Sequence, residues 1–104
     1  MPYRAPLDDM LFVLTEICEA GQLSTLPGFE DATPDTIAAV LEQAAAFTSG
    51  VLAPLNRTGD KSGARKTADG VKTVDGWQDA YKQFTEGGWN GVTFDTAYGG
   101  MGLP

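Results

Sequence analysis

Apolar residues recur at three- and four-residue intervals in three separate segments, the spacing of one face of an α-helix. The first segment contains Leu7, Met10, Leu11, Leu14, Ile17 and Cys18. The second contains Ile37, Val40, Leu41, Ala44, Phe47, Val51 and Leu55, and the third contains Trp77, Ala80, Tyr81 and Phe84. The pattern predicts an all-α fold, a small helical domain of three main helices near residues 6–20, 34–53 and 76–86, with little or no sheet.

Local signals place the ends of the first two helices. Pro6 suits the first helical position and Gly21 suits a stop. Thr33 supplies a capping hydroxyl before Pro34, and Pro54 should disrupt the second helix. The second helix is therefore the most clearly bounded element. Leu41 lies in the middle of its stripe, and we expect replacement of this leucine by alanine to be especially costly.

The third helix and the connections follow from turn signals. Asp75 is expected to cap the third helix, and Gly87-Gly88 to end it. Residues 56–75 read as a loop because glycine and polar residues dominate them. Within and after it, Val71–Val74 and Gly91–Phe94 are compatible with short extended segments.

The composition of the chain excludes some classes of partner and of chemistry. The chain has 104 residues, no histidine and a net charge of −7. Residues 1–55 carry one cation against eight anions, residues 56–75 five against three, and residues 76–104 one against three. This balance disfavours nucleic acid as a partner, because phosphate binding needs clustered cations. We also expect no secretion signal, no membrane span and a cytoplasmic location. Without histidine, the commonest general base and metal ligand are both missing.

Glycine-rich and cationic segments give no specific binding motif. Gly59-Asp60-Lys61-Ser62 lacks the glycines of a phosphate-binding loop, and Gly99-Gly100-Met101-Gly102 lacks the spacing of a dinucleotide fingerprint. A solvated turn is the better interpretation of the former. The cations Lys61, Arg65, Lys66 and Lys72 could touch a phosphate, but a solvated loop is favoured.

Two further groups are interpreted as core. Cys18 lies on the apolar stripe of the first helix, so we expect a small buried residue rather than a nucleophile. Four aromatic residues could line a ligand pocket, but their helical spacing favours packing. They are Trp77, Tyr81, Phe84 and Trp89.

Several segments, in order along almost the whole chain, resemble the acyl-CoA dehydrogenase family. Tyr3–Leu14 resembles the N-terminal extension of one bacterial subgroup, which includes enzymes similar to methylmercaptopropionyl-CoA dehydrogenase. Leu52–Asp60 resembles the end of the following helix. Gly76–Phe84 and Glu86–Trp89 resemble the next helix and its turn. Tyr98–Pro104 resembles the family's loop before the helix that begins to shape the acyl pocket.

The resemblance implies a piece of a larger enzyme. The family has a helical N-terminal domain, a β-barrel-like middle domain and a C-terminal helical bundle. Its members oxidise an acyl-CoA between the α and β carbons: a glutamate removes the α-proton, FAD accepts the β-hydride, and electrons pass to an electron-transfer flavoprotein. Residues 1–32 are expected to be the N-terminal extension helix and connection. Residues 33–104 are expected to begin the helical domain and to end before the FAD-binding middle domain.

The family's flavin contacts and glutamate base belong to the later domains. No catalytic, cofactor-binding or metal-binding residue is therefore expected here, and substrate-binding residues are left unassigned. FAD is expected in the full-length parent and not in this piece. Expected partners are the remaining parent domains, acyl-CoA, the electron-transfer flavoprotein and further copies in a homo-oligomer. The alternative is an independent acidic helical module that binds a partner protein through an exposed apolar face.

Overall fold

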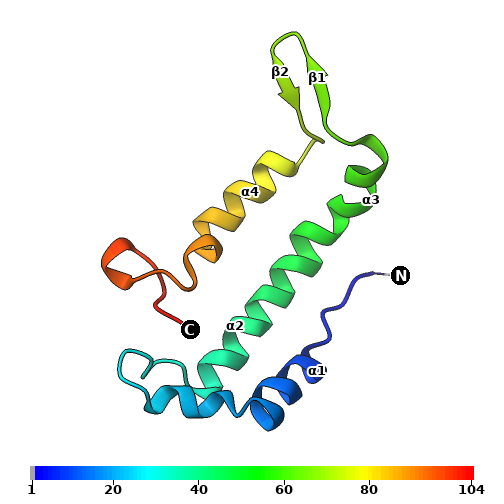
Figure 1. Ribbon diagram of the computed structural model, residues 1–104. Helices are drawn as coiled ribbons and strands as arrows, with labels where there is room; N and C mark the ends of the chain where they lie inside the picture. Colours follow the sequence, from blue (N-terminus) through cyan, green and yellow to red (C-terminus); the bar gives the residue numbers. More distant parts are fainter. Residues whose placement is uncertain (1) are drawn as a thin grey trace.

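A computed structural model of the chain, describing residues 2–104, is mostly helical, which confirms the all-α prediction (Figure 1). The main elements are helices α1 (Leu7–Phe12), α2 (Pro34–Phe47), α3 (Ala53–Ser62) and α4 (Trp77–Glu86), and strands β1 (Arg65–Thr67) and β2 (Gly70–Lys72). Two π-helical turns (Val13–Ile17 and Thr48–Leu52) and three 3₁₀ turns (Ala20–Thr25, Trp89–Gly91 and Thr96–Tyr98) complete the helical segments.

α2 and α3 form one continuous helix, Pro34–Ser62, so the predicted end before Pro54 is wrong. A proline inside an α-helix normally removes a hydrogen bond and collides with the carbonyl four residues earlier. Here the π-helical turn changes the hydrogen-bond pattern just before the proline, and the Ala53 N–H donates to the Thr48 carbonyl, five residues back. Pro54 then falls in the first turn of α3, where a missing N–H is tolerated.

The start of α2 agrees with the prediction. The Thr33 side-chain oxygen accepts a hydrogen bond from the Thr36 N–H at 3.2 Å, and Pro34 occupies the first turn. The Thr33 and Thr36 hydroxyls also lie 3.0 Å apart, within hydrogen-bonding distance. The cap fixes where the long helix begins.

The first helical segment is shorter than predicted. α1 continues through its π-helical turn, and the Cys18 N–H donates to the Val13 carbonyl. Glu19 then adopts a left-handed conformation with φ of 50°, which ends the helix before the expected stop at Gly21. The reversal places Ala20 in one of the few buried positions of the chain.

α4 has the predicted extent, but its predicted cap is wrong. Gly76 is the N-cap residue, with φ of 92°, and no side chain caps this end. A Cβ on Gly76 would lie 3.0 Å from Leu55 Cδ2. Glycine therefore serves both the left-handed turn and the close approach of α4 to α3.

Residues 56–75 are more ordered than the predicted loop. Their first part, through Ser62, completes α3, and β1 pairs antiparallel with β2 in the register Arg65↔Lys72, Lys66↔Val71 and Thr67↔Gly70. The extended segment expected around Val71 is thus half of a small hairpin. It projects beyond the α3 end, at the top of Figure 1.

The chain after α4 folds back on itself, and backbone hydrogen bonds join its last residues to residues 91–94. Met101 N–H donates to the Gly91 carbonyl, Gly102 N–H to Phe94, and Leu103 N–H to Val92. Residues 89–91 form a 3₁₀ turn, and residues 91–94 contain no strand. The extended segment expected at Gly91–Phe94 is therefore not formed. The terminal glycine-rich segment is therefore an organised loop.

The molecule is open and flat. α4 runs antiparallel beside α2 and α3, while α1 and the N-terminal segment lie along another side of the long helix (Figure 1). The radius of gyration is 17.1 Å and the extents are 54 × 37 × 17 Å, whereas a compact domain of this length has a radius of gyration of about 13 Å. The accessible surface is 7899 Å², against about 5,600 Å² for a compact monomer of this mass.

Little of the chain is buried. Among residues 2–104, only Ala20, Ala32 and Ala80 are buried, and no large side chain is fully enclosed. Leu41, whose replacement by alanine was expected to be especially costly, is only half-buried in the chain alone. The structure has the helices of a domain without a closed core.

We predict that Gly100→Ala disrupts the C-terminal loop. A Cβ at Gly100 would collide with the Phe94 carbonyl oxygen and its carbon, and backbone cannot move aside as a flexible side chain can. The expected loss of stability is about 1–3 kcal/mol, as for other overpacked sites. Urea unfolding and amide hydrogen exchange of residues 91–103 measure it.

Gly50→Ala is the matched control. Gly50 lies inside the long helix and nothing approaches its added Cβ within 4 Å. Alanine is favoured over glycine there by about 0.5–1 kcal/mol. Equal stability losses in the two variants would show that the loop geometry is wrong.

Candidate functional site

The polar side chains of the described residues were searched first for metal-ligating groups and for buried atoms without partners. Within 2–104, no group of three or more His, Cys, Asp or Glu side chains could hold a metal ion, and no buried side-chain nitrogen or oxygen lacks a partner. Hydrogen bonds from the backbone N–H groups of Glu30 and Gly28 lower the pKa of the Glu30 carboxyl. This carboxylate stabilises a turn, because the Gly28 N–H lies 3.0 Å from Glu30 Oε2. None of these features resembles an acid–base pair.

The glycine-containing motif at residues 59–62 does not have the structure of a phosphate-binding loop. Gly59-Asp60-Lys61-Ser62 forms the end of α3, whereas a phosphate-binding loop must precede a helix. Gly59 instead receives the Trp77 ring, since an added Cβ would lie 2.9 Å from Trp77 Cζ2. Cys18 is exposed, so its predicted place in the core is wrong. The first helical segment ends at Ile17, next to Cys18, and the thiol side chain stays exposed to solvent.

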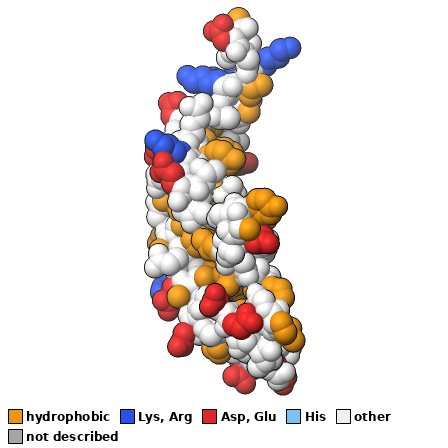
Figure 2. Space-filling view, turned by 90° about the vertical axis from the view of Figure 1, so that its left-hand side faces the viewer, with side chains coloured by type: hydrophobic (Ala, Val, Ile, Leu, Met, Phe, Trp, Pro, Cys, Tyr) orange, Lys and Arg blue, Asp and Glu red, His pale blue; other side chains and the backbone are white. Residues whose placement is uncertain are grey.

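The cationic residues gather around the hairpin and are solvated. Lys61, Arg65, Lys66 and Lys72 are all exposed, and blue side chains appear at the hairpin end in Figure 2. Arg65 lies opposite Lys72 in the register, an arrangement that like charges disfavour. The ion pair found in residues 2–104 lies elsewhere, between Lys82 and Glu86 of α4.

Aromatic packing joins α4 and the C-terminal loop to the long helix. The Phe47 ring lies 6.2 Å from Phe84 and 6.4 Å from Trp89, centroid to centroid, and Tyr81 lies 6.3 Å from Phe84. Such separations suit favourable ring contacts. The prediction of packing is confirmed for Phe84 and Trp89, which are half-buried. Phe47, an ordinary member of the α2 stripe in the sequence, is the ring that both contact.

The other two predicted aromatic residues are largely exposed. Trp77 is 48% and Tyr81 67% exposed, so the expectation that they lie in a core is not met in this chain. With Leu52, Leu55, Ala80 and Phe84 they line an open groove of about 430 Å³ between α3 and α4. We call this the aromatic groove.

A second hollow opens where α1, α2 and the C-terminal loop meet. Its volume is about 340 Å³, and its lining is almost entirely aliphatic. Its lining includes Leu14, Ile37, Val40, Leu41, Leu103 and Pro104. We call this the aliphatic hollow.

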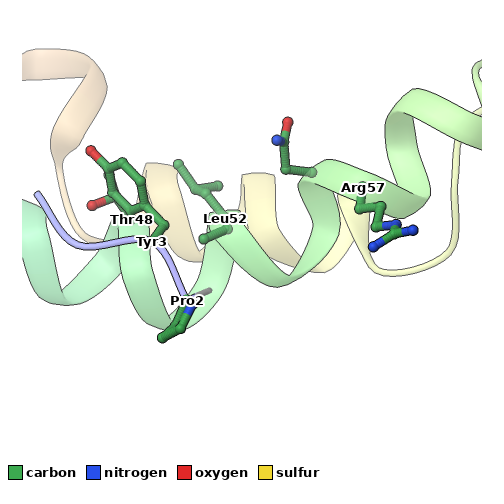
Figure 3. Close-up of a pocket in the computed structure, with 7 residues that line it drawn as sticks. Pro2, Tyr3, Thr48, Leu52 and Arg57 are labelled. Carbon is green, nitrogen blue, oxygen red and sulfur yellow. The ribbon is translucent and has the colours of Figure 1, made fainter.

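A third hollow, of about 490 Å³, separates the N-terminal segment from the long helix. Tyr3 lies over the helix beside Thr48 and Leu52, with Arg57 one turn further along (Figure 3). Leu52 therefore borders both this hollow and the aromatic groove. The π-helical turn thus presents exposed apolar surface on two sides.

The aliphatic hollow and the aromatic groove are lined mostly by apolar side chains, whereas the third hollow also contains Thr48, Asn56 and Arg57. Orange side chains appear along the length of the face in Figure 2, and the large exposed residues include Met10, Phe12, Ile17, Leu26, Leu52 and Phe94. Exposed apolar residues in this number are typical of a surface that packs against another body. We therefore treat the exposed apolar residues around these hollows as a candidate packing surface.

Comparison with known proteins shows what the chain is similar to. No protein-family model matches the chain. Across all 104 residues, however, the chain is 34% identical to 3-methylmercaptopropionyl-CoA dehydrogenase of Ruegeria pomeroyi. The chain matches the N-terminal part of an acyl-CoA dehydrogenase. This finding confirms the resemblance that the sequence segments indicated. The chain spans 18% of the length of that relative.

One helix has an ambiguous composition. Pro34–Ser62 is long and apolar enough to cross a membrane by length and hydropathy alone. The evidence is weak, because the core helix of a soluble protein passes the same test. In this structure its apolar residues face α1, α4 and the C-terminal loop, as they do in the aliphatic hollow and the aromatic groove.

We predict that the purified chain self-associates through the aromatic groove. The exposed rings gain about 25 cal/mol per Å² of apolar surface removed from water. Tyr81→Lys should shift the association, measured by sedimentation velocity over a range of concentrations, toward monomer. A lysine there would have to be desolvated in the interface.

Tyr98→Lys is the matched control, because Tyr98 is 89% exposed and borders none of the three hollows. It should associate like the parent chain. A monomeric parent chain at high concentration, or equal effects of both lysines, would contradict the assignment.

Proposed function

We propose that this chain is the N-terminal structural part of an FAD-dependent acyl-CoA dehydrogenase and is catalytically silent alone. Its role is to pack against the remaining domains and help bound the acyl pocket. The observation that carries the proposal is the end-to-end match to a dehydrogenase of which the chain covers 18%. The candidate packing surface supports it, because a piece of a larger body exposes the surfaces that the body covers.

The parent's proposed reaction is oxidation of an acyl-CoA thioester between its α and β carbons. That reaction needs a base at one carbon and an electron acceptor at the other, held in one water-poor site. FAD is the proposed acceptor. The proposed partners are the other parent domains, acyl-CoA, an electron-transfer flavoprotein and further subunits, with a soluble, cytoplasmic location.

The aliphatic hollow and the aromatic groove do not fit a flavin. A flavin ring needs hydrogen-bond donors and acceptors at its edge, and a pyrophosphate needs backbone N–H groups or cations. The aliphatic hollow offers one hydroxyl, Thr36, which is already engaged with Thr33. The aromatic groove offers the Asn56 amide, the Tyr81 hydroxyl and the Trp77 indole N–H, without a cation. We therefore place the flavin contacts in the rest of the parent.

The alternative, an independent interaction module, relies on the same exposed apolar surface. The two proposals differ in what the gene encodes after Pro104. A reading frame that continues for several hundred codons after Pro104 supports the dehydrogenase, and a stop codon there supports the module.

We predict that the purified 104-residue chain is colourless and does not reduce a dye acceptor with any acyl-CoA. The full-length parent should be yellow and active with an acyl-CoA. Visible absorbance spectra and a dye-reduction assay measure both. Stoichiometric flavin absorbance in the short chain would overturn the domain assignment.

We predict that Leu41→Ala costs more in the parent than in this chain. Leu41 is half-buried here, so truncation should cost about 1–2 kcal/mol, roughly half the cost of truncating a fully buried leucine. In the parent, the other domains should cover the Leu41 side chain, and the loss of unfolding free energy should then reach the full range of about 2–5 kcal/mol. Thermal unfolding of both proteins measures the difference.

Glu42→Ala is the control on the exposed side of the same helix. It should change either protein by no more than about 0.5 kcal/mol. If Leu41→Ala had the same small effect in the parent, the aliphatic surface would remain uncovered there, against the proposal.

A further inference from the structure

A small pocket lies at the base of the hairpin, where the chain leaves α3 for β1 and leaves β2 for α4 (Figure 1). Its volume is about 260 Å³. α3 contributes Thr58 and Ser62 to the lining, and the segment between β2 and α4 contributes Thr73 and Asp75. Each of the two strands contributes one cation. We call this the hairpin pocket.

The two cations of the hairpin pocket are Arg65 of β1 and Lys72 of β2. They lie directly opposite each other in the antiparallel register, so both side chains extend from the same face of the hairpin. Like charges in this arrangement repel each other. Within residues 2–104 neither has a carboxylate at ion-pair distance, since the ion pair found there joins Lys82 to Glu86. An anion bound between the two side chains would remove the repulsion.

Three hydroxyls border the same space. Thr58 and Ser62 are four residues apart on α3, so they lie on one face of that helix. Thr73 directly follows β2. All three residues are exposed, and a hydroxyl can rotate to donate a hydrogen bond to an oxygen. The hairpin pocket therefore has neutral donors beside its two positive charges.

A phosphate group fits this set of donors better than a carboxylate does. The planar guanidinium of Arg65 can hold two oxygens of one ligand, and the Lys72 ammonium can bind a third. A carboxylate has only two oxygens, whereas a phosphate group has three and carries a charge of about −2 at neutral pH. A water molecule takes about 30 Å³ of the liquid. The pocket, at about 260 Å³, therefore has room for a phosphate group and several waters.

We propose that the hairpin pocket binds a phosphate group between Arg65 and Lys72, either as free phosphate or as part of a nucleotide. The Asp75 carboxylate also lines the pocket and opposes an anion there. The site is exposed to solvent as well, so binding is weak, with a dissociation constant on the order of 1 mM. This proposal does not depend on the assignment to a dehydrogenase.

The test is an amide NMR titration of the 104-residue chain with sodium phosphate, in which sodium chloride keeps the ionic strength constant. Saturable shift changes should be confined to residues 58–75. Arg65→Gln and Lys72→Gln should each weaken binding by about fivefold or more, because each removes a charged hydrogen-bond donor. Lys66→Gln is the matched control. It removes the same charge from the opposite face of β1, outside the pocket lining, and should change binding by less than about twofold.

Asp75→Asn tests the opposite sign. Loss of the carboxylate should strengthen phosphate binding about two- to threefold. Titration with adenosine monophosphate then identifies the source of the group: tighter binding than that of inorganic phosphate assigns a nucleotide, and equal or weaker binding assigns free phosphate. Shifts that do not saturate, equal losses in Lys66→Gln and Lys72→Gln, or weaker binding after Asp75→Asn would each overturn the proposal.

Discussion

The packing of Phe47 against Phe84 and Trp89 holds the two halves of this molecule together. One ring on the long helix contacts both α4 and the turn that starts the C-terminal loop. The hairpin carries no buried residue, so it cannot supply the apolar packing that positions α4. The antiparallel arrangement therefore depends on the aromatic contact together with the close approach of Gly59 to Trp77 and of Gly76 to Leu55.

A single layer of helices cannot enclose its own apolar residues. Each helix packs on a neighbour along one side, and the residues above and below the layer stay open. The measured surface reflects this geometry: 7899 Å², about 2,300 Å² more than expected for a compact monomer of this mass. A standard protein interface buries about 800 Å² per partner, so the excess is large enough for extensive contact with a larger body.

The chemistry of the chain is consistent with a structural role. Its acids are spread over solvated surfaces and its cations gather at an exposed hairpin. Two of its three hollows, the aliphatic hollow and the aromatic groove, are lined mostly by apolar side chains. A reaction centre concentrates polar groups in a sheltered site. In residues 2–104 the sheltered positions are occupied by three alanines.

The sequence by itself determined the helical segments and the resemblance to acyl-CoA dehydrogenases, which the comparison supports. Periodic apolar residues located all three helical segments, and the Thr33 hydroxyl correctly marked the start of α2, because both are local signals. The tertiary structure decided what depends on distant residues. Pro54 continued a helix because the π-helical turn before it rearranged the hydrogen bonds, and Gly76, packed on Leu55, replaced Asp75 at the start of α4. Cys18 and Leu41 show the same limit, since periodicity identifies an apolar face, whereas burial depends on whether another element lies against it.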